Sequence, residues 1–201
     1  MTPRPRPSAA AAGSVTVGAM ARLFLGLDLP PSVDAHLELM SVGIPGARWE
    51  GRDRFHLTLS FFGEVDGRVQ RELIDALIGL RVAPFDLTLK GVGIFPPRGA
   101  PTTLWVGVLD PGPVGALKQR LDARLRGVAV TPDPRKFVPH VTLARVGDSP
   151  VDAVVAYMSD HVLFRSETFP VTEVLLYSSV RTAKGSHYRV EAGFSLTAVG
   201  G

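Results

Sequence analysis

Two short segments of the sequence combine a histidine with a threonine in a pattern that could support acid–base chemistry. Residues 56–59 read HLTL and residues 140–143 read HVTL, and each tetrad lies in an apolar run. Because strand side chains alternate between two faces, the histidine and threonine of each tetrad face one way while the apolar residues face a core. Each segment therefore presents an imidazole and a hydroxyl side by side, with alpha carbons roughly 7 Å apart.

The two pairs together suit a phosphate group. His56 and His140 could serve as general base and general acid on opposite sides of phosphorus, because histidine titrates near about pH 6.5 and a coupled pair can share one proton. Thr58 and Thr142 could donate hydrogen bonds to the non-bridging oxygens. A single H-x-T triplet has an ordinary alternative, a strand histidine beside an outward threonine. Its repetition predicts a shared catalytic role.

Length and composition narrow the class of protein. The chain has 201 residues, of which 45% are hydrophobic and 20% charged, which suits one compact domain or two small lobes that share a core. The absence of cysteine excludes disulfides, cysteine-ligated zinc and thiol catalysis, and is compatible with a cytoplasmic location. The net charge of +3 fits an anionic ligand but carries little weight alone. No apolar run approaches the about 18 residues of a membrane-spanning helix, so no membrane association is expected.

The first 19 residues have a different composition from the rest. They are rich in proline, alanine and arginine and contain no acidic residue. The alanine run is too short and too weakly apolar for the core of a signal peptide. Residues 1–19 are therefore predicted to be a disordered tail, and residues 20–201 a single domain. Met20 directly precedes the first expected strand and is a candidate for the true start.

Hydrophobic periodicity predicts the elements that must position the tetrads. Strands are expected over residues 22–29, 55–62, 85–92, 103–109, 138–146, 163–169, 171–179 and 188–196. Helices are expected over residues 32–40, 67–80, 114–125 and 150–159, with Ser32 and Asp66 as N-caps of the first two. The motif strands occupy corresponding places in the two halves, and the last three strands follow without a helix between them. This order favours an α+β fold with mixed or antiparallel sheets, in two pseudo-twofold lobes with the site in the cleft between them.

Several further segments resemble the two-histidine (2H) phosphoesterases, and specifically the bacterial and archaeal RNA 2′,3′-cyclic phosphodiesterases of the LigT/ThpR type, once called 2′-5′ RNA ligases. The segments that carry the resemblance are RLFLGLDLP, Arg48-Trp49, HLTLSFFGEV, PHVTLAR, and FPVTEVLLYSSV followed by Gly185 and Tyr188. Together they span about residues 20–197, which is everything except the tail. Arg54 departs from the pattern, because the family often has asparagine two residues before the first histidine.

The resemblance implies a bilobal LigT-like α+β fold that hydrolyses a 2′,3′-cyclic phosphate, on RNA ends or nucleotides, to a 2′-phosphomonoester. It implies no metal and no other cofactor. The catalytic roles carry over to His56 and His140, with His140 activating water and His56 protonating the ribose O3′. Phosphate contacts carry over to Thr58 and Thr142, and the basic residue after the second motif carries over to Arg145.

Arg145 needs a particular backbone to take that role. It lies an odd number of residues from His140, so on an unbroken strand it would face away from the phosphate. A bulge or a strand end must re-aim it, and a solvated or structural arginine is the alternative.

Other functions stay open at the level of sequence. One is a ligase acting on 2′-5′ RNA junctions, another is a non-catalytic nucleotide- or RNA-binding module of the same fold, and a third is a structural duplication whose histidines do not converge. The other histidines lack metal-ligand spacing, so no metal site is expected. No obligate protein partner is apparent, and a monomer is expected. Candidates to stack on a nucleobase, with core packing as the alternative for each, are Phe24, Phe61, Phe95 and Tyr188.

Overall fold

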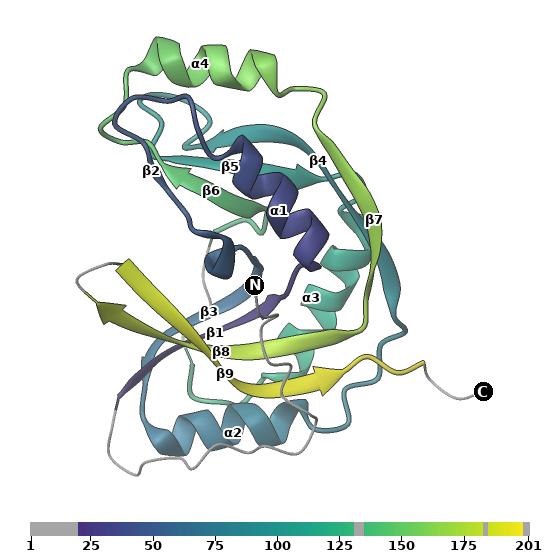
Figure 1. Ribbon diagram of the computed structural model, residues 1–201. Coiled ribbons are helices and arrows are strands. Elements are labelled where there is room, and N and C mark those ends of the chain that lie inside the picture. The colour runs from purple at the N-terminus through teal and green to yellow at the C-terminus, as the bar shows by residue number, and fades with distance from the viewer. Residues whose placement is uncertain (1–19, 131–134, 183–184, 199–201) are drawn as a thin grey trace.

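The computed structural model describes residues 20–130, 135–182 and 185–198, so the tail expected over residues 1–19 lies outside the described part. Figure 1 shows the arrangement of its elements. The strands are β1 (Ala21–Leu27), β2 (Arg48–Trp49), β3 (Leu57–Val65), β4 (Phe85–Phe95), β5 (Thr103–Val108), β6 (Val141–Arg145), β7 (Arg165–Val171), β8 (Glu173–Thr182) and β9 (Gly185–Ser195). The helices are α1 (Pro31–Met40), the short 3₁₀ turn η1 (Arg52–Arg54), α2 (Gly67–Leu77), α3 (Gly112–Arg124) and α4 (Val151–Asp160).

All strands of the described residues belong to one nine-stranded antiparallel sheet. Its order is β7-β4-β5-β6-β3-β1-β8-β9, and the short β2 pairs with β6 outside this path. The two motif strands, β6 and β3, stand next to each other in the middle of the order. The sheet divides there into a first lobe (β3, β1, β8, β9) and a second lobe (β6, β5, β4, β7). The predicted bilobal α+β architecture is thus confirmed.

The chain crosses between the lobes rather than completing one before the other. Strand β4 follows α2 but pairs with β5 in the second lobe, whereas β8 returns to pair with β1 in the first. The series β1-α1-β3-α2-β4 therefore corresponds to β5-α3-β6-α4-β8, with β7 and β9 as edge strands. Each half of the sequence contributes a strand to the other lobe, so the two lobes form a single folding unit.

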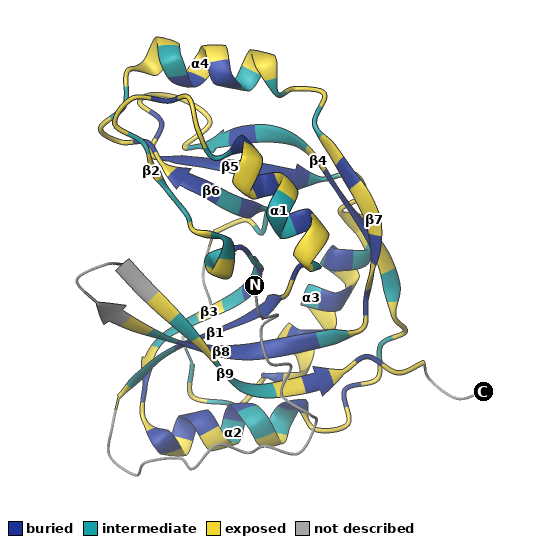
Figure 2. Ribbon diagram, in the orientation of Figure 1, coloured by how far each residue is buried: buried dark blue, intermediate teal, exposed yellow. Residues whose placement is uncertain are grey.

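The helices cover the two lobes in pairs. Helices α2 and α3 contact each other beside the first lobe (Figure 1). Helices α1 and α4 are joined by the Tyr157 hydroxyl, which donates to the Met40 carbonyl oxygen at 2.8 Å. Figure 2 shows that each helix alternates buried and exposed residues, as helices with one apolar face do. None of the helices in the described part has both the length and the apolar character needed to cross a bilayer.

Helices α1 and α2 begin with different N-cap residues. Asp66 is the N-cap of α2, as predicted, and its carboxylate accepts from the backbone N–H groups of Arg68 at 2.9 Å and Val69 at 2.8 Å. The prediction for Ser32 was wrong, because α1 begins at Pro31 with Pro30 in the N-cap position. Proline suits the first helical position because the N–H it lacks would have no helical partner there. The Ser32 hydroxyl instead hydrogen-bonds the Glu167 carboxylate in β7.

The motif strands begin later than the sequence predicted. Strand β3 starts at Leu57 and β6 at Val141, so each motif histidine lies directly before its strand rather than inside it. Before His140, Pro139 has no N–H to offer a ladder. Each histidine ring also hydrogen-bonds a carbonyl of its own chain two residues earlier, which holds that segment out of the sheet. Helix α2 ends at Leu77, three residues earlier than predicted.

The packing of α2 gives a prediction for stability. Leu77 is fully buried, whereas the adjacent Ile78 is 63% exposed. We expect Leu77→Ala to lower the free energy of unfolding by about 2–5 kcal/mol, because it removes apolar contacts and leaves a cavity. The matched change Ile78→Ala should stay within about 0.5 kcal/mol of the parent. Urea unfolding of the three proteins measures both, and equal losses would contradict this account of the core.

Candidate active site

One residue pair joins the two motif strands. Leu57 in β3 pairs with Val141 in β6, and both side chains are fully buried. In an antiparallel ladder, directly opposed residues face the same side of the sheet and the next residue on each strand faces the other side. Continuing this register by one residue in each direction sets the histidine of each motif opposite the threonine of the other.

The four motif side chains therefore share one face of the sheet. In this register, the position of His56 corresponds to that of Thr142, and the position of His140 to that of Thr58. The two histidines occupy diagonal corners of this arrangement. All four residues are partly exposed, in contrast to the buried pair between them. The tetrads thus converge, as catalysis by both would require.

Both imidazoles are oriented in the same way. The Nδ1 atom of His56 lies 2.7 Å from the Arg54 carbonyl oxygen, and Nδ1 of His140 lies 2.7 Å from the Val138 carbonyl oxygen. A carbonyl oxygen can only accept, so Nδ1 of each ring carries a proton. The other ring nitrogen, Nε2, can act as an acceptor when the ring is neutral and as a donor when it is protonated.

The last residue of each tetrad is a β-bulge. Thr142 pairs with Trp105 and Ala144 pairs with Leu104, so Leu143 between them has no partner in β5. The first motif repeats this arrangement: Thr58 pairs with Gly26 and Ser60 with Leu25, which leaves Leu59 unpaired. A bulge inserts one residue and so reverses which face the following side chains take. In both strands the residue three positions after the threonine therefore returns to the motif face.

In the second lobe, this residue is Arg145. It pairs with Thr103, which lies two residues from Trp105 and so shares its face. The guanidinium Nη1 donates to the Thr103 hydroxyl at 2.9 Å. The bulge required to aim Arg145 toward the motif histidines is thus present in β6.

In the first lobe, the equivalent residue is Phe61. It pairs with Phe24, and their rings lie 6.3 Å apart at an angle of 16°. The pseudo-twofold axis therefore relates an arginine and a threonine in one lobe to two phenylalanines in the other. The two sides of the site differ in chemistry although they share a backbone plan.

Aromatic rings flank both histidines. The Phe24 ring lies 4.7 Å from the His56 ring, and Tyr188 meets it edge-on at 5.1 Å. Phe95 meets the His140 ring edge-on at 4.9 Å, and Trp105 lies 5.9 Å from it. These rings exclude water from one side of each imidazole.

Gly26 has a steric role beside the first motif. A Cβ atom at this position would lie 3.1 Å from the Leu57 carbonyl oxygen, 3.4 Å from the Tyr177 ring and 3.6 Å from Cδ2 of His56. The bare backbone at Gly26 therefore leaves room for the Leu57 carbonyl of the neighbouring strand, and a Cβ atom there would only touch the His56 ring.

The surroundings shift two pKa values. Burial is the main cause that lowers the pKa of His140; Arg145 and Arg135 lower it further, while the hydrogen bond to the Val138 carbonyl opposes them. Burial is also the main cause that raises the pKa of Tyr188, and Glu50 raises it further. The lowered pKa keeps His140 neutral at neutral pH, so its Nε2 can accept a proton.

The loop before the first motif is tied to the second motif strand. The Glu50 N–H donates to the Leu143 carbonyl oxygen at 2.7 Å, and the Glu50 carboxylate pairs with the Arg54 guanidinium at 3.2 Å. The Arg54 carbonyl in turn accepts from His56. Arg54, where the family often has asparagine, thus forms an ion pair that helps to hold this loop.

Three residues beside the histidines could not be identified from the sequence, because it does not show which strands pair. Trp105, Tyr177 and Gly26 all lie in strands that the periodicity predicted. Only the pairing of β5 with β6, and of β1 with β3 and β8, brings them beside the histidines. No local pattern indicates such pairing. Among the described residues, no group of three histidine, aspartate or glutamate side chains gathers as metal ligands would.

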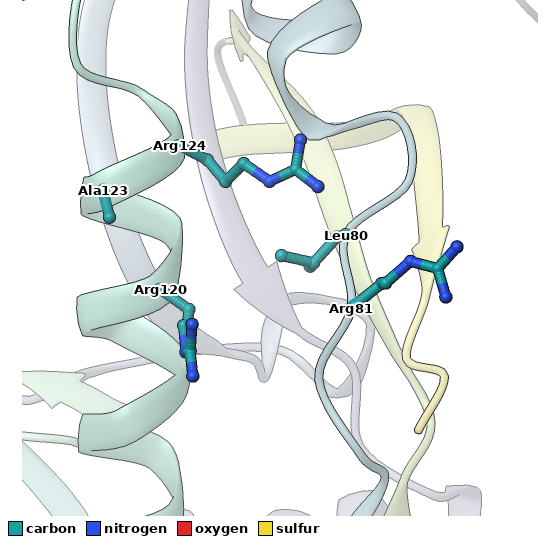
Figure 3. A pocket seen from close by; sticks show the side chains of 5 residues that line it. All are labelled: Leu80, Arg81, Arg120, Ala123 and Arg124. Carbon is teal, nitrogen blue, oxygen red and sulfur yellow. The ribbon is translucent and has the colours of Figure 1, made fainter. Parts of the chain in front are cut away.

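A separate hollow of about 380 Å³ lies between α3 and the segment after α2 (Figure 3). Its lining residues are Leu80, Arg81, Arg120, Ala123 and Arg124. Arg124 donates to the Gly79 carbonyl oxygen at 2.6 Å, just beyond the end of α2. Cations are also favoured in the last turn of a helix such as α3. Arg124 therefore has a structural explanation, and none of the three arginines that line the hollow belongs to either motif.

Comparison with known proteins places this chain beside a family of RNA-processing enzymes. The model of the 2′-5′ RNA ligase superfamily matches residues 30–183. A Thermotoga maritima protein named RNA 2′,3′-cyclic phosphodiesterase is 32% identical over 183 residues, covering 84% of this chain and 92% of that protein. An Aeropyrum pernix protein of the same name is 31% identical over 139 residues, covering 68% and 79%.

Solved structures share the fold. The structure of TT0787 from Thermus thermophilus has a TM-score of 0.73 and 26% identity, covering 88% of this chain and 98% of that one. Escherichia coli LigT in complex with 3′-AMP also has a TM-score of 0.73, with 25% identity, covering 89% and 99%. The likeness therefore extends over both lobes.

The environment of His140 gives a prediction for its titration. We expect its ring to titrate below the ordinary histidine value of 6.5, because burial disfavours the charged form. The folded protein then binds this proton less readily than the unfolded chain. Its contribution to stability is complete above pH 6.5 and is lost as the pH falls through the lowered pKa. NMR titration of the ring checks this, and a midpoint at or above the value of a free histidine peptide would contradict it.

Proposed function

Because this chain belongs to the 2′-5′ RNA ligase superfamily, we propose that it hydrolyses 2′,3′-cyclic phosphates on RNA ends or nucleotides to 2′-phosphomonoesters. The observation that carries the proposal is the Leu57–Val141 pair, which brings both tetrads to one face. Relatives named RNA 2′,3′-cyclic phosphodiesterase support the same reaction. The complex of E. coli LigT with 3′-AMP supports a nucleotide ligand.

In this proposal, the two histidines act on opposite sides of phosphorus. Neutral His140 takes a proton from water through Nε2 as the water oxygen bonds to phosphorus. Protonated His56 gives its Nε2 proton to the ribose O3′ as the bond between phosphorus and O3′ breaks. The phosphate stays on O2′, and proton exchange with solvent restores both rings. Nδ1 of each ring keeps its proton throughout, held by a backbone carbonyl.

The neighbouring side chains would stabilise the charge on phosphorus. Thr58 and Thr142 would donate hydrogen bonds to the non-bridging oxygens, and Arg145 would supply a positive charge on the same face. Strain in the five-membered cyclic ester lowers the barrier that these groups must overcome. The reaction assigned to them uses neither a metal nor another cofactor.

The lowered pKa of His140 supports its assignment as the base. A ring that stays neutral at neutral pH is ready to accept a proton, and Arg145 beside it disfavours a second positive charge. Sequence symmetry alone left the order of the two roles open.

Both tetrads come from a single chain, so the proposal extends to a monomer with RNA or a nucleotide as its partner and no obligate protein partner. RNA is abundant in the cytoplasm, and we assign the enzyme to that compartment.

A second candidate is ligation of 2′-5′ RNA junctions, which the description of the matched family favours. A 5′-hydroxyl would then take the place of water, and the departing group would again be O3′. Supplying RNA with a 5′-hydroxyl together with RNA ending in a cyclic phosphate separates the two, because only ligation lengthens the chain.

We expect His56→Ala and His140→Ala each to lower turnover of a nucleoside 2′,3′-cyclic phosphate at least about a hundredfold, the usual scale for one acid or base. Their folding should survive, because both side chains are partly exposed. His187→Ala is a control on an exposed histidine of β9. The assay contains a chelator. Near parental turnover in either motif variant, or activity only after a metal is restored, would defeat the mechanism.

A complex with a 2′-phosphonucleotide tests the order of the roles. His56 Nε2 should lie about 3 Å from the ribose O3′, and His140 should contact the phosphate oxygen on the opposite side. A His140 contact with O3′ would reverse the assignment. Formation of a 3′-phosphate in the assay would show that the assumed leaving group is wrong.

A further inference from the structure

On the motif face, a row of side chains leads away from the motif histidines along β1. Arg22, Phe24 and Gly26 alternate with the buried Leu23 and Leu25, so they share one face of this strand. Gly26 lies beside His56, and Phe24 is the next residue of the row. The row thus begins at the candidate active site and runs along the first lobe.

Phe61 and Arg22 continue the row beyond Phe24. The ring of Phe61 lies 6.3 Å from that of Phe24, and the Arg22 guanidinium carbon lies 5.3 Å from the centre of the Phe61 ring. Phe24 is buried, but Phe61 is 39% exposed. An exposed ring supported by a buried one is a surface on which a base can stack.

Arg22 has an unsatisfied donor. Its Nε atom is buried and has no hydrogen-bond partner. Glu64 lies opposite Arg22 in the strand pair, yet no ion pair joins Arg22 to a carboxylate within the described ranges. Arg22 also lines a hollow of about 530 Å³, where Glu191 is held by Ser178 at 2.7 Å and by Arg189 at 3.8 Å. An anion that enters this hollow would therefore meet the Arg22 side chain.

The position of Arg22 excludes it from the reacting phosphate. It lies four residues along β1 from Gly26, which corresponds to roughly 13 Å of strand. A phosphate held between the motif histidines is out of its reach. An RNA with a terminal 2′,3′-cyclic phosphate continues only in the 5′ direction, so the next phosphate along that chain is the available anion.

We propose that Phe61 and Arg22 form a subsite for the nucleotide on the 5′ side of the terminal one, so that the enzyme prefers RNA ends to mononucleotides. Phe61 stacks on the base of that nucleotide, and Arg22 pairs with its phosphate. This inference rests on the proposed cyclic phosphodiesterase function and names its substrate class.

The second lobe has no such extension. The pseudo-twofold equivalents of Phe24 and Phe61 are Thr103 and Arg145, which hydrogen-bond each other. The position equivalent to Arg22 is Pro101, which is buried and carries no charge. The asymmetry assigns the reacting phosphate to one side of the site and the remaining RNA chain to the other.

The test compares two substrates that share their terminal nucleotide. One is a nucleoside 2′,3′-cyclic phosphate, and the other is a short oligoribonucleotide that ends in the same group. We expect the ratio of kcat/KM for the oligonucleotide to that for the mononucleotide to fall about tenfold in Phe61→Leu and in Arg22→Gln. Effects on the chemical step cancel in this ratio. Arg22→Gln should also reduce the salt dependence of the oligonucleotide reaction by about one counterion.

Arg68→Gln is the matched control, because Arg68 lies on α2 and pairs with Glu72 away from the motif face. An unchanged ratio in both Phe61→Leu and Arg22→Gln, or an equal loss on the two substrates, would overturn the subsite. Melting temperatures identify a variant that fails to fold, and the other variant then decides. A parent protein that hydrolyses neither substrate would overturn the proposed function itself, whereas hydrolysis of both with no preference would overturn the subsite alone.

Discussion

The site depends on the pairing of two buried apolar residues. Leu57 and Val141 are the point where the two lobes of the sheet meet. Their side chains are held on the core side by burial, and a slip of one residue would expose them and bury the polar side chains next to them. The hydrophobic effect therefore fixes the register, and the register in turn fixes the positions of the polar residues on the other face.

The bulges at Leu59 and Leu143 add a second constraint. Each bulge keeps a leucine in the core while it reverses the alternation of the residues that follow. This brings Arg145 to the motif face in one lobe and Phe61 to the same face in the other. The same type of β-bulge, present in both motif strands, thus gives the site a cationic side and an aromatic side.

Much of the fold could be predicted from the chain itself. Periodicity indicated every strand of three or more residues and the α-helices to within a few residues, and the Asp66 cap follows from local chemistry. The starts of the motif strands were wrong because a ring-to-carbonyl hydrogen bond competes with the ladder at each histidine. The prediction of Ser32 as an N-cap was wrong because Pro31 fits the first helical position, so the helix begins one residue earlier.

The sequence by itself determined which groups are available for chemistry: two imidazoles and two hydroxyls, each pair spaced to share a face. It could do so because side-chain alternation is a local property of a strand. Only the tertiary structure decided which rings surround the histidines, that burial lowers the pKa of His140, and that Arg22 continues the row from Phe61. These depend on strand order and register, which join residues far apart in the chain and leave no local pattern.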